Sequence, residues 1–92
     1  MPMPIISVPA LMKYYVDEKT EIEVNGETVA QALDDLTAHY PSIKSHIMDN
    51  HGKLRRHVNL FVNKENIRAL DGLNTSVKVT DRIILMPSIS GG

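Results

Sequence analysis

Residues 28–41, TVAQALDDLTAHYP, carry the clearest structural signal in the chain. Thr28 followed three residues later by Gln31 is a capping box, in which the hydroxyl accepts from an early backbone N–H and the glutamine reaches back. Pro41 limits the helix on the other side, because the residue before a proline is disfavoured in helical conformation. Between them, apolar side chains recur at the spacing that lines one helical face: Val29, Ala32, Leu33, Leu36 and Tyr40.

Two stretches typical of strands precede this helix. Residues 3–8, MPIISV, are rich in β-branched side chains, and Pro4 suits the edge or start of a strand. Residues 21–24, EIEV, alternate between polar and apolar, as in a half-buried strand. We expect an opening hairpin whose connection, residues 10–20, is a long loop with at most a short turn of helix.

Further strands follow the helix. Residues 57–63, HVNLFVN, alternate so that one face is apolar, and residues 82–86, RIILM, predict the last strand. Ile67 and Arg68 are expected to form a short edge strand, and residues 42–48 no more than an irregular turn. The order of elements predicts an α+β fold in which one mixed sheet packs on one main helix.

Composition narrows the functional classes. The chain has 92 residues, a net charge of −1 and no cysteine. This charge lacks the basic excess of a dedicated nucleic-acid binder, and no run of about 18 apolar residues predicts a membrane span. Residues 1–4, MPMP, do not resemble a signal peptide, so we expect a cytoplasmic protein with no membrane partner. Without cysteine, a disulfide scaffold, a zinc ribbon and a thiol nucleophile are excluded.

No catalytic or metal-binding constellation is evident in the sequence. The adjacent carboxylates Asp34 and Asp35 diverge on a helix, and nothing in the spacing of serine, histidine and aspartate suggests a triad. Metal ligands must converge on one point, which the spacing of the four histidines does not indicate: His39, His46, His51 and His57. We therefore expect neither an enzyme nor a metal site.

Strand alternation predicts an apolar patch on the sheet face turned away from the helix. Phe61, Ile84 and Met86 point opposite to the side chains that face the core, and exposed apolar patches often mark partner sites. The alternatives are that the Tyr14-Tyr15 region or a second copy of the chain covers this face. Arg55 and Arg56, next to Lys53, form a small basic cluster that either pairs with acidic groups of a partner or is a solvated edge.

The last five residues are suited to present a terminal carboxylate for modification. Residues 88–92, SISGG, show no periodicity and little to bury, so we expect a mobile tail that reaches about 17 Å when extended. Gly91 and Gly92 lack Cβ atoms and fit a narrow channel. The terminal carboxylate is ionised at neutral pH, with a reference pKa of about 3.5. As a poor acyl electrophile, it needs activation by a leaving group such as AMP. A frayed end without function is the alternative.

A family resemblance joins these features. The residues that carry it are Gly52 to Asn63, Gly72-Leu73, Thr80-Asp81, Arg82 to Pro87 and the terminal Gly91-Gly92. On these stretches the chain resembles, over almost its whole length, the ubiquitin-like sulfur-carrier family of the MoaD, ThiS and CysO type. The resemblance looks closest to the CysO-type carriers, which serve cysteine biosynthesis. It implies a ubiquitin-like β-grasp domain over residues 1–87 and a tail over residues 88–92 that carries the activated glycine.

The resemblance also implies a mechanism. A ubiquitin-activating-type adenylyltransferase would use ATP and Mg to adenylate Gly92, and a sulfur donor would convert the adenylate to a thiocarboxylate. A sulfur-accepting synthase, similar to a cysteine synthase or to the large subunit of molybdopterin synthase, would take the sulfur. The carrier would bind no cofactor itself. Its partner-binding residues would be Phe61, Ile84, Met86, Arg55 and Arg56, beside the tail residues Ser88, Ile89, Ser90 and Gly91.

Two other functions fit the same residues. A ubiquitin-like protein modifier would form isopeptides through the activated Gly92, and its conjugates would survive boiling and reductant. A noncovalent ubiquitin-like binding module would tolerate extra residues after Gly92, which neither reading based on acyl chemistry would. The sulfur acceptor cannot be named from the carrier, because the pocket that selects it belongs to the partner.

Overall fold

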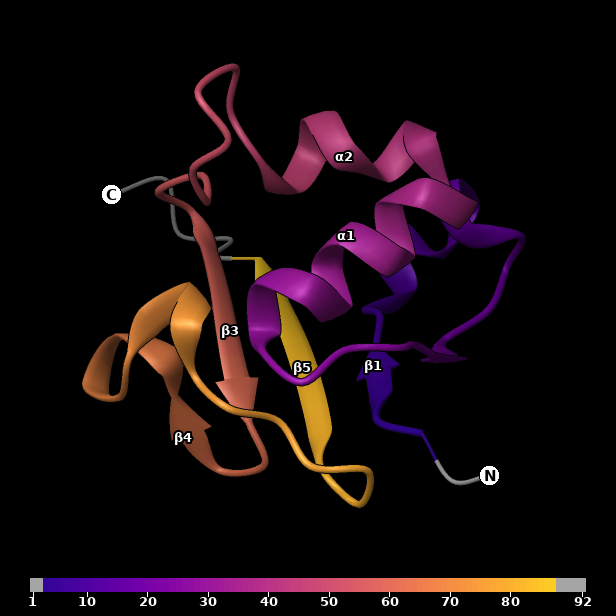
Figure 1. Cartoon of the computed structure of the whole chain (residues 1–92). Helices are drawn as coiled ribbons and strands as arrows, with labels where there is room; N and C mark the ends of the chain where they lie inside the picture. The colour runs from indigo at the N-terminus through magenta and orange to yellow at the C-terminus, as the bar shows by residue number, and fades with distance from the viewer. Residues whose placement is uncertain (1–2, 88–92) are drawn as a thin grey trace.

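A five-stranded mixed sheet with two helices on one face forms the body of the protein (Figure 1). The computed structural model describes residues 3–87. The sheet order is β2-β1-β5-β3-β4, and of its neighbouring pairs only β1 and β5 are parallel. The strands are β1 (Ile5–Ser7), β2 (Glu21–Glu23), β3 (Val58–Val62), β4 (Glu65–Asn66) and β5 (Arg82–Pro87). The helices are α1 (Val29–His39) and α2 (Pro41–Ile47), with 3₁₀ helices η1 (Ala10–Val16), η2 (Ile67–Ala69) and η3 (Gly72–Asn74).

Helix α1 begins at the predicted capping box. The Thr28 hydroxyl accepts from the Gln31 backbone N–H at 3.2 Å, and the Gln31 side-chain oxygen accepts from the Glu27 N–H at 2.8 Å. In the usual capping box this side chain accepts from the N–H of the cap residue itself. Here Gln31 reaches one residue further back and gives the Glu27 N–H a hydrogen-bond acceptor. The predicted apolar face is buried at Val29, Ala32, Leu33 and Leu36.

A second, shorter helix follows the predicted main helix. Residues 41–47 form α2, where an irregular turn was expected over residues 42–48. Pro41 ends α1 and also begins α2, because the first position of a helix needs no backbone N–H donor. Ile43 and Ile47, four residues apart, are both fully buried, so two side chains are enough to fix this short helix on the core.

The edge strand lies earlier than predicted. Strand β4 is Glu65–Asn66, whereas the expected residues Ile67 and Arg68 belong to η2. A tight turn explains the shift, because Asn63 takes a left-handed conformation (φ 58°) and Val62 then pairs directly with Glu65. The Asn66 side chain accepts from the Arg68 N–H at 2.9 Å and so starts the 3₁₀ helix.

The core lies between the sheet and the two helices. On the helix side of the sheet the strands bury Ile6, Val58, Leu60, Val62, Ile83 and Leu85, as the alternation predicted for β3 and β5. The connection between β1 and β2 is more ordered than expected: it holds the seven-residue η1, which buries Met12 and Val16. No helix within residues 3–87 has the length and apolar character needed to cross a membrane.

The contribution of α2 can be measured directly. Ile47→Ala should lower the free energy of unfolding by about 2–5 kcal/mol, because it removes a fully buried side chain and leaves a cavity. Val79→Ala, at a position that is 51% exposed, is the control and should change it by no more than about 0.5 kcal/mol. If urea unfolding shows the same loss of stability for Ile47→Ala and Val79→Ala, the packing described for α2 is contradicted.

Candidate functional site

Strand β5 brings the end of the chain to the middle of the sheet. It pairs in parallel with β1, where Ser7 lies opposite Ile84, and antiparallel with β3, where Val58 lies opposite Pro87. Ile83 and Leu85 anchor it in the core. The predicted tail residues follow directly and lie outside the described part of the chain: Ser88, Ile89, Ser90, Gly91 and Gly92.

The predicted apolar patch lies on the open face, the side of the sheet turned away from α1 and α2. Phe61 lies directly opposite Ile84 in the β3–β5 pair, and both are half-buried. Met86 is 52% exposed and lies opposite Asn59, one pair before Pro87. The structure therefore brings the three residues together beside the start of the tail, while their binding to a partner stays a prediction.

The Tyr14-Tyr15 region does not cover this face, contrary to one of the alternatives. The Tyr15 ring stacks on His46 of α2, with centroids 4.1 Å apart, and so lies on the helix side of the molecule. Tyr14 is 78% exposed.

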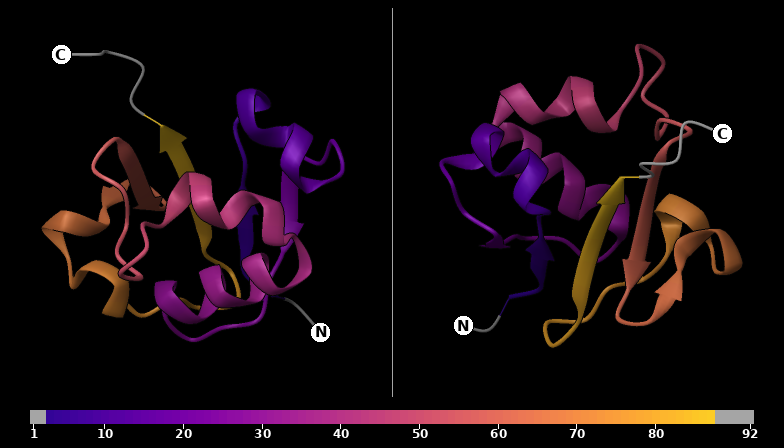
Figure 2. Two further views of the ribbon diagram at one scale, coloured as in Figure 1. Left: turned by 90° about the horizontal axis from the view of Figure 1, so that it is seen from above. Right: turned by 180° about the vertical axis from the view of Figure 1, so that it is seen from behind.

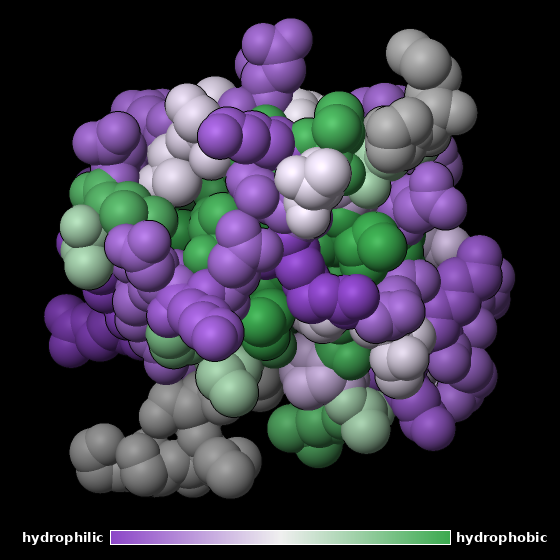
Figure 3. Space-filling view, turned by 90° about the horizontal axis from the view of Figure 1, so that it is seen from below, coloured by the Kyte–Doolittle hydropathy of each residue, from purple (hydrophilic) through white to green (hydrophobic). Residues whose placement is uncertain are grey.

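Seen from below, the end of the molecule where β5 begins shows small hydrophobic areas separated by hydrophilic side chains (Figure 3).

Two arginines that the sequence analysis did not select flank the apolar patch. Arg68 donates to the Asn59 side chain and to the Val58 carbonyl, the latter at 3.3 Å. Arg82 donates to the Ser7 hydroxyl at 2.8 Å and pairs with the Glu21 carboxylate. Strand alternation alone places Arg82 on the open face, whereas Arg68 depends on η2, which was not predicted.

The two predicted basic residues have different surroundings. The Arg55 Nε donates to the Ser45 carbonyl at 2.6 Å, which ties its side chain to the carboxyl-terminal part of α2. Arg56 is exposed just before β3, and its carbonyl accepts from Arg68 at 3.4 Å. Arg56 therefore lies beside the open face, while Arg55 is held at the helix layer.

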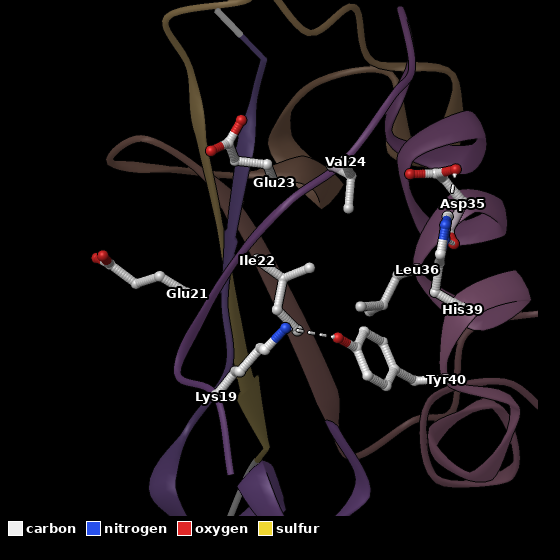
Figure 4. Close-up of a pocket in the computed structure, with 9 residues that line it drawn as sticks. All are labelled: Lys19, Glu21, Ile22, Glu23, Val24, Asp35, Leu36, His39 and Tyr40. Atoms are coloured by element: carbon white, nitrogen blue, oxygen red, sulfur yellow. Dashed lines mark hydrogen bonds and ion pairs between the residues drawn. The ribbon is translucent and has the colours of Figure 1, made fainter. Parts of the chain in front are cut away.

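A groove lies between β2 and α1 (Figure 4). Ile22 and Leu36 point into it, and Glu21 points away. The Lys19 ammonium donates to the Tyr40 hydroxyl at 3.2 Å, and this hydrogen bond raises the pKa of Lys19. This hydrogen bond ties the loop before β2 to the end of α1.

The predicted histidines are dispersed in the fold. The His39 Nδ1–H donates to the Asp35 carbonyl, 2.9 Å away, and His46 stacks on Tyr15. Within residues 3–87 no three side chains of histidine, aspartate or glutamate gather as a metal site would require. The open face, beside the carboxyl end of β5, is the candidate functional surface.

Comparison with known proteins identifies the family. The model of the ThiS family matches residues 6–92. The chain belongs to the ThiS family. The predicted family and the ubiquitin-like β-grasp fold are thereby confirmed, since the structural relatives share the fold over nearly the whole chain.

Several relatives of this ThiS-family chain are similar along most of its length. The sulfur carrier protein CysO of Mycobacterium tuberculosis is 32% identical, over 95% of this chain and 96% of its own. A chain in the crystal structure of the Amycolatopsis orientalis BexX/CysO complex superposes with a TM-score of 0.88 and 29% identity, covering 97% of this chain and 99% of that one. Small archaeal modifier protein 1 of Methanosarcina acetivorans has a TM-score of 0.84 and 32% identity, covering 97% and 95%.

The turn before β5 gives a pH-dependent prediction. The Asp81 carboxylate accepts from the Lys78 N–H at 2.8 Å and from the Asn63 amide at 3.0 Å, and these bonds lower the pKa of Asp81. The carboxylate therefore stabilises the fold above its unfolded-state pKa of about 3.9, and this contribution is lost as the pH falls through the lower folded-state value. Asp81→Asn should cost about 1 kcal/mol at neutral pH and less in acid.

The measurement is urea unfolding of both proteins between neutral pH and about pH 3. Asp34→Asn, an exposed aspartate on α1, is the matched control and should leave the stability nearly unchanged. A difference between wild type and Asp81→Asn that stays constant down to low pH would contradict the assignment.

Proposed function

We propose that this chain is a sulfur carrier protein that is modified at the carboxylate of Gly92. The observation that carries the proposal is the position of β5, which lies between β1 and β3 and ends at Pro87, next to the exposed Met86 on the open face. The match of the ThiS family through residue 92 and the similarity to a CysO sulfur carrier support it.

The chemistry proceeds in two steps. The Gly92 carboxylate attacks the α-phosphate of ATP on a ubiquitin-activating-type adenylyltransferase, releasing pyrophosphate and leaving an acyl-adenylate. Hydrosulfide from a sulfur donor then attacks the acyl carbon, AMP leaves, and a thiocarboxylate remains. ATP and Mg are used by the partner, and this chain acts as a group carrier and not as a catalyst.

The pathway that we favour as the recipient of the sulfur is cysteine biosynthesis, in which a cysteine synthase-like enzyme would accept it. The support is the CysO relative, at 32% identity over 95% of this chain. Molybdopterin synthesis, through a large-subunit-like synthase, and thiamine synthesis are the other outlets of such a carrier. The open face, with Phe61, Ile84, Met86 and the adjacent Arg56, is the surface on which partner enzymes would dock, whereas Arg55 would act through its support of the neighbouring loop.

Protein modification is the second candidate. The specific observation in its favour is the similarity to small archaeal modifier protein 1, with a TM-score of 0.84. The same acyl-adenylate, attacked by a lysine amine in place of hydrosulfide, would give an isopeptide. The activation step is common to both functions, so the nucleophile decides between them.

Intact mass after incubation with the adenylyltransferase, MgATP and sulfide tests the proposal. The expected product carries the mass increase of one oxygen replaced by sulfur, and a variant that lacks Gly92 shows none. Conjugates that survive boiling and reductant, in place of the sulfur product, would establish the modifier function. No change, with an adenylyltransferase that activates another carrier in the same assay, would contradict both.

The role of the open face has its own test. Met86→Glu should raise the KM of the adenylyltransferase for this chain about tenfold, because it places a charge in an apolar contact. Val79→Glu is the matched control, since Val79 is 51% exposed and Met86 52%, and Val79 precedes β5 at the other end of the sheet. Both variants should fold, which thermal unfolding checks. A KM unchanged in Met86→Glu would exclude this face from docking.

A further inference from the structure

The 3₁₀ helix η1 presents two large hydrophobic side chains to solvent. Leu11 is 71% exposed and Tyr14 is 78% exposed, more than any other large hydrophobic residue among residues 3–87. Side chains three residues apart lie above one another on a 3₁₀ helix, so Leu11 and Tyr14 share one side. We name these two residues the η1 pair.

The η1 pair is held on a rigid support. The neighbouring residues Met12 and Val16 are buried in the core, which fixes η1 against the sheet and helices. Tyr15 stacks on His46, and the Tyr14 ring meets the Tyr15 ring edge-on with centroids 5.5 Å apart. An ordered aromatic side chain loses little entropy on binding, which is why tyrosine is frequent at the energetic centres of interfaces.

The connection that follows η1 is strained. Asp17 and Glu18 are consecutive non-glycine residues in left-handed conformation, with φ of 60° and 64°. Side chains with a Cβ atom disfavour this conformation, because the Cβ comes too close to the following carbonyl oxygen. The Glu18 N–H donates to the Lys13 carbonyl at 2.8 Å, and the two side chains form an ion pair at 3.8 Å. The fold thus maintains η1 in one place against a local preference.

That place is the end of the sheet from which the tail leaves. Strands β1 and β5 are parallel neighbours, with Ser7 opposite Ile84, so both strands run toward the same end. The pairing ends at Ser7, and the chain continues through Pro9 into η1, which starts at Ala10. Figure 2 shows η1 and the carboxyl end of β5 at the same end of the molecule.

The length of the tail restricts where a partner enzyme sits. Five residues, 88–92, follow β5 and span at most about 17 Å. An enzyme that reacts with Gly92 must therefore bring its reactive centre within that distance of Pro87. The enzyme surface around its channel for the tail then lies against the side chains near the carboxyl end of β5. Leu11 and Tyr14 are the most exposed hydrophobic side chains at this end of the molecule.

We propose that the η1 pair is a second docking surface for the adenylyltransferase, separate from the open face, and that it contacts an apolar surface beside the channel for the tail. The inference rests on the proposed function. Leu11 and Tyr14 would hold the carrier on one side of the tail while Phe61, Ile84 and Met86 hold it on the other. Two contacts, one on each side of the tail, would fix both its direction and its distance relative to the reactive centre of the enzyme.

We assign the η1 pair to the adenylyltransferase and not to the sulfur acceptor because the two enzymes recognise different groups at the end of the chain. The acceptor receives a thiocarboxylate, whose sulfur nucleophile marks the correct reactant. The adenylyltransferase receives an ordinary glycine carboxylate without side chains near it, so selection has to come from the folded body. A rigid apolar pair beside the tail supplies that selection.

The test compares the double variant Leu11→Ala/Tyr14→Ala with Val79→Ala. An adenylyltransferase of the ubiquitin-activating type that activates the wild-type chain is used with MgATP and sulfide, and AMP release is followed at varied carrier concentration. The double variant should raise the KM for the carrier about tenfold or more with little change in kcat, and Val79→Ala should behave as wild type. Thermal unfolding should show all three proteins folded, because the substituted side chains are exposed.

The other outcomes overturn the inference in distinguishable ways. If the wild-type chain is activated and the KM of the double variant is unchanged, the η1 pair is not a docking surface although the proposed function stands. If the variant is impaired only in sulfur transfer from its thiocarboxylate, the acceptor is the partner. If sedimentation shows a wild-type dimer and a monomeric double variant, the pair joins two copies of this chain. Failure of the wild-type chain to be activated overturns the proposed function itself.

Discussion

The parallel pairing of β1 with β5 is the interaction on which the rest of the structure depends. It places β5 between β1 and β3, hydrogen-bonded on both sides, with Ile83 and Leu85 fully buried beneath the helices. A strand in that position cannot fray without opening the core. Residues 82–84 are therefore held on both sides, whereas residues 85–87 pair with β3 alone. The parallel direction of β1 and β5 puts η1 at the same end of the molecule as the carboxyl end of β5 (Figure 2).

This arrangement separates the folded body from the chemistry. Several charged groups near the open face are engaged in structural contacts: Arg82 with Glu21 and Ser7, Arg68 with Asn59, Asp81 with the turn before β5. What the body offers a partner is mainly apolar surface near the end of β5, with the exposed Arg56 beside it. A carrier needs no more than this, because the reactive group is the carboxylate and the catalytic groups belong to the enzymes that it visits.

Sequence patterns predicted the elements whose signals are local and repeated. The capping box of α1 and the alternation in β3 and β5 gave the correct core face, and the same alternation placed Phe61, Ile84 and Met86 together on the open face. Helix α2 was missed because two isoleucines make too short a pattern, and its stability comes from packing. Strand β4 was misplaced because a left-handed Asn63 sets the register. The η1 pair was not found, since nothing in residues 10–16 reveals which side chains the core takes.

Pyrophosphate exchange tests most directly the central claim, that the chain presents Gly92 to an adenylating enzyme. The enzyme is incubated with ATP and labelled pyrophosphate, with the full chain or with a chain that lacks Gly91 and Gly92. The account predicts exchange of label into ATP that depends on the full chain and is abolished by the truncation. Exchange that is equal with both chains, or none with an enzyme that is active on another carrier, would contradict it.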